Sequence, residues 1–105
     1  MHTWLGAKVN RYIFLPAIGS TSKRTREIDV LLTADIVSYP VRIPIECKNE
    51  KSPIGTPKID AFVGKLADVG IANQHGIYVS TNGYTKSAIE RALAAGIKPL
   101  VLSGI

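Results

Sequence analysis

The chain has 105 residues, which is enough for one hydrophobic core and too few for two. Hydrophobic residues make up 46% of it and charged residues 20%, and this composition excludes disordered and coiled-coil proteins. One cysteine and two histidines exclude an intrachain disulfide and a structural zinc site. The formal net charge of +5 is typical of proteins that bind polyanions, although it also serves solubility alone.

Targeting signals are not found in the sequence. The first eight residues lack the basic and apolar segments of a signal peptide, and no apolar run approaches the roughly 18 residues of a membrane span. We therefore expect a single domain over residues 1–105 that stays in the reducing cytoplasm and does not bind membranes.

The first half of the chain is predicted to form strands. Residues 9–15 are rich in β-branched and aromatic side chains, which predicts a strand. Residues 17–25 change to glycine, serine, threonine and basic residues, which is typical of an exposed loop. Residues 27–33 and 41–47 are two further predicted strands, and the turn at residues 38–40 makes them an antiparallel hairpin.

A helix is predicted over residues 58–69. Thr56 is its expected N-cap, Pro57 suits the first helical position, and Gly70 is its expected end. Apolar residues recur there at helical spacing, so one side of the helix is expected to face the core. These residues are Ile59, Phe62, Val63 and Leu66.

The second half of the chain continues as strand, helix and strand. Strands are predicted at residues 76–80 and 97–102, and between them a helix is predicted to begin after its cap Thr85 and to end at Gly96. Its expected apolar face consists of Ala88, Ile89, Ala92 and Leu93. Strands that alternate with helices favour parallel pairing, so the sheet is expected to be mixed.

The most informative segment of the sequence is the end of the third predicted strand, where a carboxylate and an ammonium group stand close together. Glu46 and Lys48 are two residues apart, so they share one face of the strand. On the preceding strand Asp29 interrupts a run of apolar residues, so this carboxylate needs a partner. The other face of the third strand, which we interpret as the core face, carries Ile43, Ile45 and Cys47.

Asp29 and Glu46 are predicted to face each other across the hairpin. Two carboxylates held this close repel each other unless a cation lies between them, and oxygen ligands suit Mg²⁺ or Mn²⁺. Such a cation polarises a phosphodiester and lowers the pKa of a bound water, and Lys48 steadies the developing negative charge. The alternative is an ordinary salt bridge of Lys48 with Glu46 or Glu50.

These residues carry a family resemblance. Asp29 followed by Glu46-Cys47-Lys48 resembles the PD-(D/E)XK motif of the restriction-endonuclease-like nucleases. The downstream order is similar to the catalytic domain of Mrr-like type IV restriction endonucleases over residues 26–102. The segments that match are Lys51-Ser52-Pro53-Ile54, Ile59-Asp60-Ala61-Phe62, Lys65-Leu66, Gly76-Ile77-Tyr78-Val79-Ser80, Gly83-Tyr84-Thr85-Lys86-Ser87-Ala88 and Ala95-Gly96-Ile97.

The resemblance implies an α/β restriction-endonuclease-like fold, in which helices flank a central mixed β-sheet. It also implies that Asp29 and Glu46 bind Mg²⁺ or Mn²⁺, that the Cys47 backbone carbonyl is a third ligand, and that Lys48 is the catalytic lysine. Ile28 stands where the motif's name has proline. The N-terminal helix of the family is expected to be missing, because only eight residues precede the first predicted strand.

Seven further residues are predicted to contact DNA. Basic side chains near the site bind phosphates in a salt-dependent way, and Lys65, with Lys51 and Lys58, is expected to line the approach to the metal site. The alternative for all of these side chains is a solvated surface. The predicted contacts are Lys23, Arg24, Arg26, Lys51, Lys58, Ser80 and Asn82. Turn formation alone also explains Asn82.

The leading hypothesis is a metal-dependent DNA endonuclease of the Mrr-like type, with Asp29, Glu46 and Lys48 as its catalytic residues. A homodimer is expected, because one metal site cuts one strand. A Holliday-junction-resolvase-like nuclease is a close variant. The alternatives from other classes are a catalytically silent nucleic-acid-binding module and a core that folds only within a larger assembly.

Overall fold

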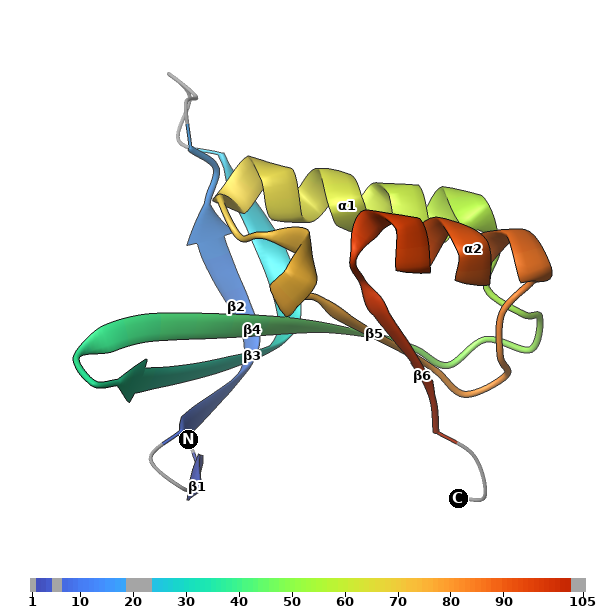
Figure 1. Ribbon diagram of the computed structural model, residues 1–105. Helices are drawn as coiled ribbons and strands as arrows, with labels where there is room; N and C mark the ends of the chain where they lie inside the picture. The colour runs from blue at the N-terminus through green and yellow to red at the C-terminus, as the bar shows by residue number, and fades with distance from the viewer. Residues whose placement is uncertain (1, 5–6, 19–23, 103–105) are drawn as a thin grey trace.

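A computed structural model describes residues 2–4, 7–18 and 24–102 of the chain. Within these residues, six strands form one sheet in the order β1-β2-β3-β4-β5-β6, and helices α1 and α2 both lie on one side of it (Figure 1). The bounds are β1 His2–Trp4, β2 Ala7–Pro16, β3 Thr25–Ile36, β4 Tyr39–Lys48, α1 Thr56–Val69, the 3-10 turn η1 Asn73–His75, β5 Ile77–Ser80, α2 Lys86–Ala95 and β6 Lys98–Val101.

The sheet is mixed, as the sequence predicts. Strands β1 to β4 pair antiparallel, whereas β4, β5 and β6 pair parallel through the two helical connections. The α/β restriction-endonuclease-like arrangement is therefore confirmed, with β1 as an addition that the sequence pattern did not predict. No helix in the described part of the chain has the length and apolar character to cross a membrane.

The β3–β4 hairpin is longer and tighter than predicted. Its turn consists of Val37 and Ser38, whose φ angles are 50° and 64°, and Tyr39 and Pro40 already belong to β4. The predicted turn at residues 38–40 is therefore wrong. A two-residue turn with both φ angles positive matches the twist of the two strands and so keeps them paired to the end.

The sheet is irregular beside Asp29. Tyr12 has a φ of 51° and is skipped between the β2–β3 pairs that adjoin it. The buried residues Ile28 and Leu31 of β3 lie on either side of Asp29 and are three positions apart. Strict alternation would place them on opposite faces of the strand, so the alternation of side chains shifts by one residue there. On the other side, the β3–β4 pairing stops at Val30. Asp29 is consequently free of regular pairing on both edges.

The residues next to each helix determine where it begins and ends. Gly55, not Thr56, is the N-cap of α1, and no side chain caps this helix, so the predicted cap is wrong. Thr85 caps α2 as predicted, because its side chain accepts a hydrogen bond from the Ala88 N–H. The expected glycine ends are confirmed: Gly70 and Gly96 adopt left-handed φ angles of 73° and 89°.

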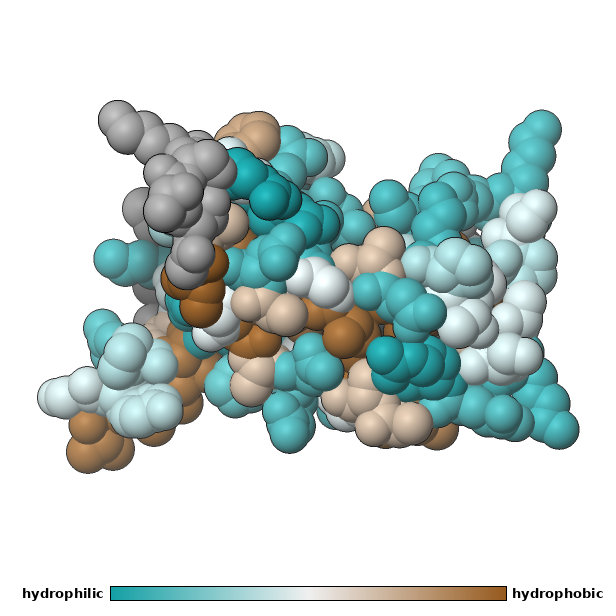
Figure 2. Space-filling view, turned by 90° about the horizontal axis from the view of Figure 1, so that it is seen from above, coloured by the Kyte–Doolittle hydropathy of each residue, from teal (hydrophilic) through white to brown (hydrophobic). Residues whose placement is uncertain are grey.

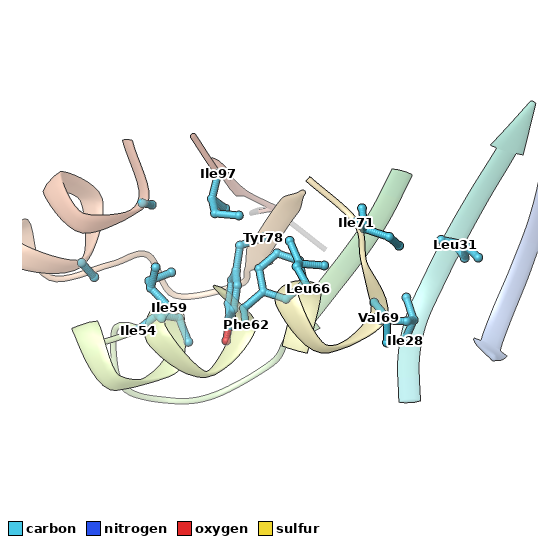
Figure 3. Close-up of a cluster of buried hydrophobic side chains, with 12 residues drawn as sticks. Ile28, Leu31, Ile54, Ile59, Phe62, Leu66, Val69, Ile71, Tyr78 and Ile97 are labelled. Atoms are coloured by element: carbon cyan, nitrogen blue, oxygen red, sulfur yellow. The ribbon is translucent and has the colours of Figure 1, made fainter. Parts of the chain in front are cut away.

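The hydrophobic core lies between the helices and the sheet (Figure 3). Phe62 and Tyr78 meet edge to face with ring centroids 5.5 Å apart, which fixes α1 on β5. Leu93, which was predicted to join the core from α2, is 63% exposed. The buried apolar residues are Ile28, Leu31, Ile54, Ile59, Phe62, Leu66, Val69, Ile71, Tyr78, Ala88, Ala92 and Ile97.

The helices cover the face of β4 that was predicted to be the outer one. Pro44 is fully buried and Glu46 is 8% exposed, whereas Cys47 is exposed. The prediction that Ile43, Ile45 and Cys47 fill the helix-covered core is therefore wrong. Alternation along a strand separates two faces but does not say which of them a later helix will cover.

Candidate active site

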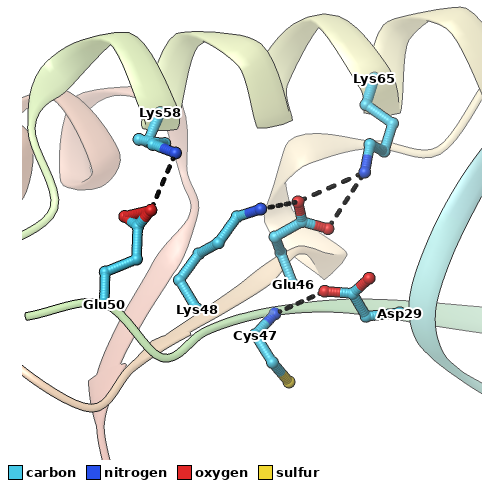
Figure 4. A network of polar contacts seen from close by, with 7 residues as sticks. All are labelled: Asp29, Glu46, Cys47, Lys48, Glu50, Lys58 and Lys65. Atoms are coloured by element: carbon cyan, nitrogen blue, oxygen red, sulfur yellow. Dashed lines mark hydrogen bonds and ion pairs between the residues drawn. The ribbon is translucent and has the colours of Figure 1, made fainter.

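The structure brings the predicted catalytic residues together at the end of the β3–β4 pairing (Figure 4). Asp29 comes from the irregular part of β3, and Glu46 and Lys48 end β4. The Asp29 carboxylate accepts a hydrogen bond of 3.0 Å from the Cys47 backbone N–H. This contact anchors Asp29 to the residue between Glu46 and Lys48.

Two lysines neutralise the buried Glu46 carboxylate. Lys65 of α1 donates to both carboxylate oxygens, at 3.1 Å and 3.3 Å, and Lys48 Nζ lies 3.8 Å from one of them. The Lys65 side chain is itself only 16% exposed. Burying a carboxylate is costly unless it is paired and hydrogen-bonded, so Lys65 of α1 completes the environment of Glu46.

Lys65 holds Glu46 in the structure, whereas the sequence predicted only that it lines the approach to the metal site. Lys58 and Lys65 are seven residues apart and share one side of α1, and they pair with Glu50 and Glu46, which are four residues apart. Two helical turns rise about 10.5 Å and four extended residues about 13 Å. This match of spacings is the signal by which the sequence could have linked the helix to the strand.

The alternative interpretation of Lys48, an ordinary salt bridge with Glu46 or Glu50, agrees with the structure only in part. Lys48 approaches Glu46 at the outer limit of an ion pair, and Glu50 pairs with Lys58 instead. The Lys48 side chain is 34% exposed, so its ammonium group stays accessible. It can therefore act on a bound substrate while it balances Glu46.

An open cleft of about 410 Å³ leads to this site. Asp29, Cys47 and Lys48 line it together with Arg11, Tyr12 and Val30. Arg11 is opposite Val30 in the β2–β3 pairing, and Tyr12 lies at the irregularity. No sequence signal identified Arg11 or Tyr12, because their position depends on the register of β2. Arg11 adds a positive charge to the approach.

The Cys47 thiol takes no part in this polar network. Partial burial raises its pKa, and the negative charges of Asp29 and Glu46 raise it further, so the thiol is neutral near pH 7. Figure 4 shows the sulfur pointing away from both carboxylates. Cys47 is exposed and was wrongly predicted to lie in the core, but its backbone is placed at the centre of the site.

The donor set fits a hard divalent cation. In the described residues, no three histidine, cysteine or acidic side chains gather into a complete metal site. Asp29 and Glu46 still supply two carboxylates from neighbouring strands, close to the Cys47 backbone, whose carbonyl is an oxygen donor of the same type. Mg²⁺ and Mn²⁺ commonly take one or two carboxylates and leave the other positions to water and substrate oxygens.

The basic residues predicted to contact DNA are placed differently from one another. Arg24 and Lys51 are exposed, whereas Lys58 is paired with Glu50. Arg26 belongs to β3, not to the preceding loop, and its guanidinium pairs with Asp68 of α1. Lys23 lies outside the described residues.

Ser80 and Asn82 form a turn at the end of β5. Ser80 is 1% exposed, its hydroxyl donates to the Gly83 carbonyl, and it accepts from the Asn82 N–H. Ser80 is therefore buried in the turn and is not positioned to contact DNA. Asn82 remains exposed beside the site.

One family model matches most of this chain. Residues 16–103 match the family model of the Mrr catalytic domain, which is described as "Restriction endonuclease". The chain belongs to this family. Asp29, Glu46 and Lys48 all lie within the matched residues. The search of curated proteins finds no match.

The Mrr-type fold also resembles a solved structure, whose title is "Crystal Structure of Protein of Unknown Function AF1548". The TM-score is 0.71 at 21% sequence identity. The match covers 91% of this chain and 50% of that chain, so this chain spans about half the length of that protein. At this identity, the likeness is one of fold.

Proposed function

We propose that this Mrr-type domain is a metal-dependent endonuclease that hydrolyses the phosphodiester bonds of DNA. The observation that carries the proposal is the convergence of Asp29, Glu46 and Lys48 where β3 and β4 part. Family membership supports nuclease activity in general. The net charge of +5 and the cationic cleft residues Arg11 and Lys48 support an anionic polymer as substrate.

Each residue of the site has a role that follows from its position. Asp29 and Glu46 would hold the cation, and the Cys47 N–H fixes the orientation of Asp29. Mg²⁺ or Mn²⁺, when bound there, supplies the charge that polarises the phosphodiester and acidifies an attacking water. Lys48 orients that water and balances the negative charge that develops on the phosphate. Lys65 does not face the cleft; it positions Glu46 from the helix side.

Cleavage of supercoiled plasmid tests this proposal. We expect nicking with Mg²⁺ or Mn²⁺ and none with EDTA, and we expect Asp29→Asn and Lys48→Met each to slow it by about 10² to 10³-fold or more. Lys98→Met is the matched control, because Lys98 is an exposed lysine at the start of β6, at the opposite end of the parallel strands from Lys48. Equal activity in Lys48→Met and Lys98→Met would contradict the role of Lys48.

Two substrate comparisons separate the alternatives. Methylated plasmid, unmethylated plasmid and a four-way DNA junction are offered at equal phosphate concentration. Preferred cutting of the junction would favour a resolvase-like nuclease. Salt-sensitive binding without any cutting would favour a catalytically silent binding module and would overturn the proposal.

A further inference from the structure

Tyr12 of β2 has an aromatic ring that the backbone does not require. The β2–β3 pairs on either side of Tyr12 place it opposite Asp29. Its φ of 51° is uncommon for a bulky residue, and it costs conformational energy. A glycine would allow the same irregularity in the strand without this strain. The need to free Asp29 from regular pairing therefore explains the backbone of this position, but it does not explain the tyrosine.

Packing does not explain the ring either. The next residue, Ile13, packs against the hydrophobic core, whereas Tyr12 is 67% exposed. The other non-glycine residues with a positive φ in the described part of the chain are Val37 and Ser38, and these form the hairpin turn. Tyr12 lies in no such turn. A strained and exposed residue beside a candidate active site is typical of a position kept for a bound molecule.

The cleft at the candidate active site opens on the face of the sheet that the helices do not cover. Tyr12 and Cys47 both line this cleft. Cys47 is exposed and follows Glu46 on β4, so the two side chains lie on opposite faces, and α1 covers the face of Glu46. Figure 2 shows the helix side, where hydrophilic side chains predominate over α1 and α2, and the cleft lies on the side turned away in that view. A ligand can therefore enter the cleft without moving a helix.

The side chains around the ring match a ligand that has both negative charge and a flat face. Arg11 and Lys48 bring two cations to the cleft, and in the described residues no carboxylate forms an ion pair with Arg11. Aromatic side chains stack on the faces of nucleic-acid bases, and Arg binds the phosphates between them. Because Arg11 and Tyr12 are adjacent, they can bind a phosphate and a base of the same strand.

The size of the cleft favours an unpaired nucleotide over a base pair. In a duplex, stacked neighbours cover both faces of each base, so a protein reaches only the base edges. A volume of about 410 Å³ lies near the lower end of the range for small-ligand sites, and it holds one base with its sugar. Opposed residues of neighbouring strands lie about 5 Å apart, so a base stacked on Tyr12 would be next to a phosphate at Asp29.

We propose that Tyr12 and Arg11 bind one unpaired nucleotide next to the cleaved phosphate, with its base stacked on the Tyr12 ring and a flanking phosphate held by Arg11. The domain therefore prefers single-stranded or locally unpaired DNA at the point of cleavage over regular duplex. This inference rests on the proposed function, because it names the form of DNA that the same site takes. Tyr12 determines specificity here and takes no part in the hydrolysis.

Binding of single-stranded DNA in EDTA tests the proposal. A thymine oligonucleotide that contains one fluorescent 2-aminopurine is titrated with the full chain, beside a duplex of the same length. Tyr12→Gly should raise the Kd for the single strand about tenfold through the loss of one stacked base, and it should leave the Kd for the duplex nearly unchanged. Tyr12→Phe keeps the ring and should bind within about twofold of the wild type. Tyr39→Gly is the matched control, because Tyr39 is 69% exposed at the other end of the hairpin, and it should bind like the wild type.

Two further readouts separate stacking from a structural role. At saturating protein, the emission of 2-aminopurine should fall with the wild type and with Tyr12→Phe but not with Tyr12→Gly, because only a stacked ring quenches the base. Tyr12→Gly also relieves a strained φ, so its urea midpoint should be above that of Tyr39→Gly, which alters a residue without a positive φ. A midpoint below that of Tyr39→Gly would show that the ring stabilises the fold, and it would overturn the proposal.

The salt dependence of binding tests Arg11 separately. Arg11→Gln should lower the slope of log Kd against log salt by about 0.7, the value for one phosphate contact on a single strand. Lys98→Gln removes the same charge from an exposed residue at the start of β6, and it should leave the slope unchanged. An unchanged slope in Arg11→Gln overturns the proposal, as does an equal Kd for the wild type and Tyr12→Gly.

Failure of this proposal and failure of the nuclease proposal are distinguishable, because binding is measured in EDTA and cleavage with Mg²⁺. If the wild type cuts plasmid and Tyr12→Gly binds single strands equally well, the nuclease proposal stands and the nucleotide-binding place is refuted. If binding depends on the ring but the wild type cuts nothing, the nucleotide-binding place stands and the nuclease proposal is refuted.

Discussion

The two ends of the β3–β4 hairpin differ in what their buried and exposed faces contain. At the site end, α1 covers a carboxylate, Glu46, and supplies Lys65 to neutralise it. At the other end, around the turn at Val37 and Ser38, neither α1 nor α2 covers the strands, and the apolar residues Ile36 and Tyr39 are exposed. The placement of the helices, more than the strand pattern, therefore determines which side chains are removed from water.

The largest expected contrast is in core packing. Leu66→Ala removes a fully buried side chain from α1 and should lower the free energy of unfolding by about 2–5 kcal/mol. Ile36→Ala, near the exposed end of the hairpin, should change it by no more than about 0.5 kcal/mol. Urea unfolding measures both. A large loss in Ile36→Ala would mean that the end of the hairpin is packed against the rest of the chain.

Lys65 and Lys58 offer a sharper contrast, because both lysines lie on α1 and each pairs with a carboxylate outside it. Lys65→Met leaves Glu46 poorly compensated in a place that is 8% exposed, and it should cost about 2 kcal/mol. Lys58→Met breaks a pair whose side chains are 46% and 42% exposed, and it should cost less than about 0.5 kcal/mol. Thermal and urea unfolding check this. Equal costs would show that α1 does not shield Glu46.

Tyr78, behind the site, gives the smallest effect and a pH signature. Burial, with the nearby charge of Glu46 next in size, raises its pKa well above the ordinary value of 10.0. The unfolded chain releases this proton near pH 10 and the folded chain only at higher pH, so the contribution of Tyr78 is full below pH 10 and is lost as the pH rises beyond it.

Tyr78→Phe should remove that part of the alkaline loss. It should change the stability at neutral pH by no more than about 1 kcal/mol, because the buried hydroxyl has no hydrogen-bond partner among the described residues. Tyr84, whose pKa is also raised by burial, keeps the remaining alkaline loss in place. Unfolding measured from pH 8 to 11 checks the expectation, with the exposed Tyr12→Phe as control. An unchanged alkaline slope in Tyr78→Phe would contradict it.

Much of the fold could be predicted from local patterns. The apolar spacing of Ile59, Phe62 and Leu66 predicted α1 and its buried side, and Thr85 and Gly96 bounded α2. These features depend on neighbours within one or two helical turns, so the sequence alone contains them. The turn at Val37 and Ser38 escaped prediction, because a valine at positive φ contradicts the usual turn chemistry.

The candidate site divides in the same way. The two-residue spacing of Glu46 and Lys48, with Asp29 one hairpin away, was readable along the chain, because adjacent strands bring such residues together. Three features depend on the tertiary structure and could not be predicted from the sequence. They are the pairing of Lys65 with Glu46, the place of Arg11 in the cleft and the exposure of Cys47. The physical reason is that alternation divides a strand into two faces, whereas the packing of α1 and the register of β2 determine which face is buried and which charges meet there.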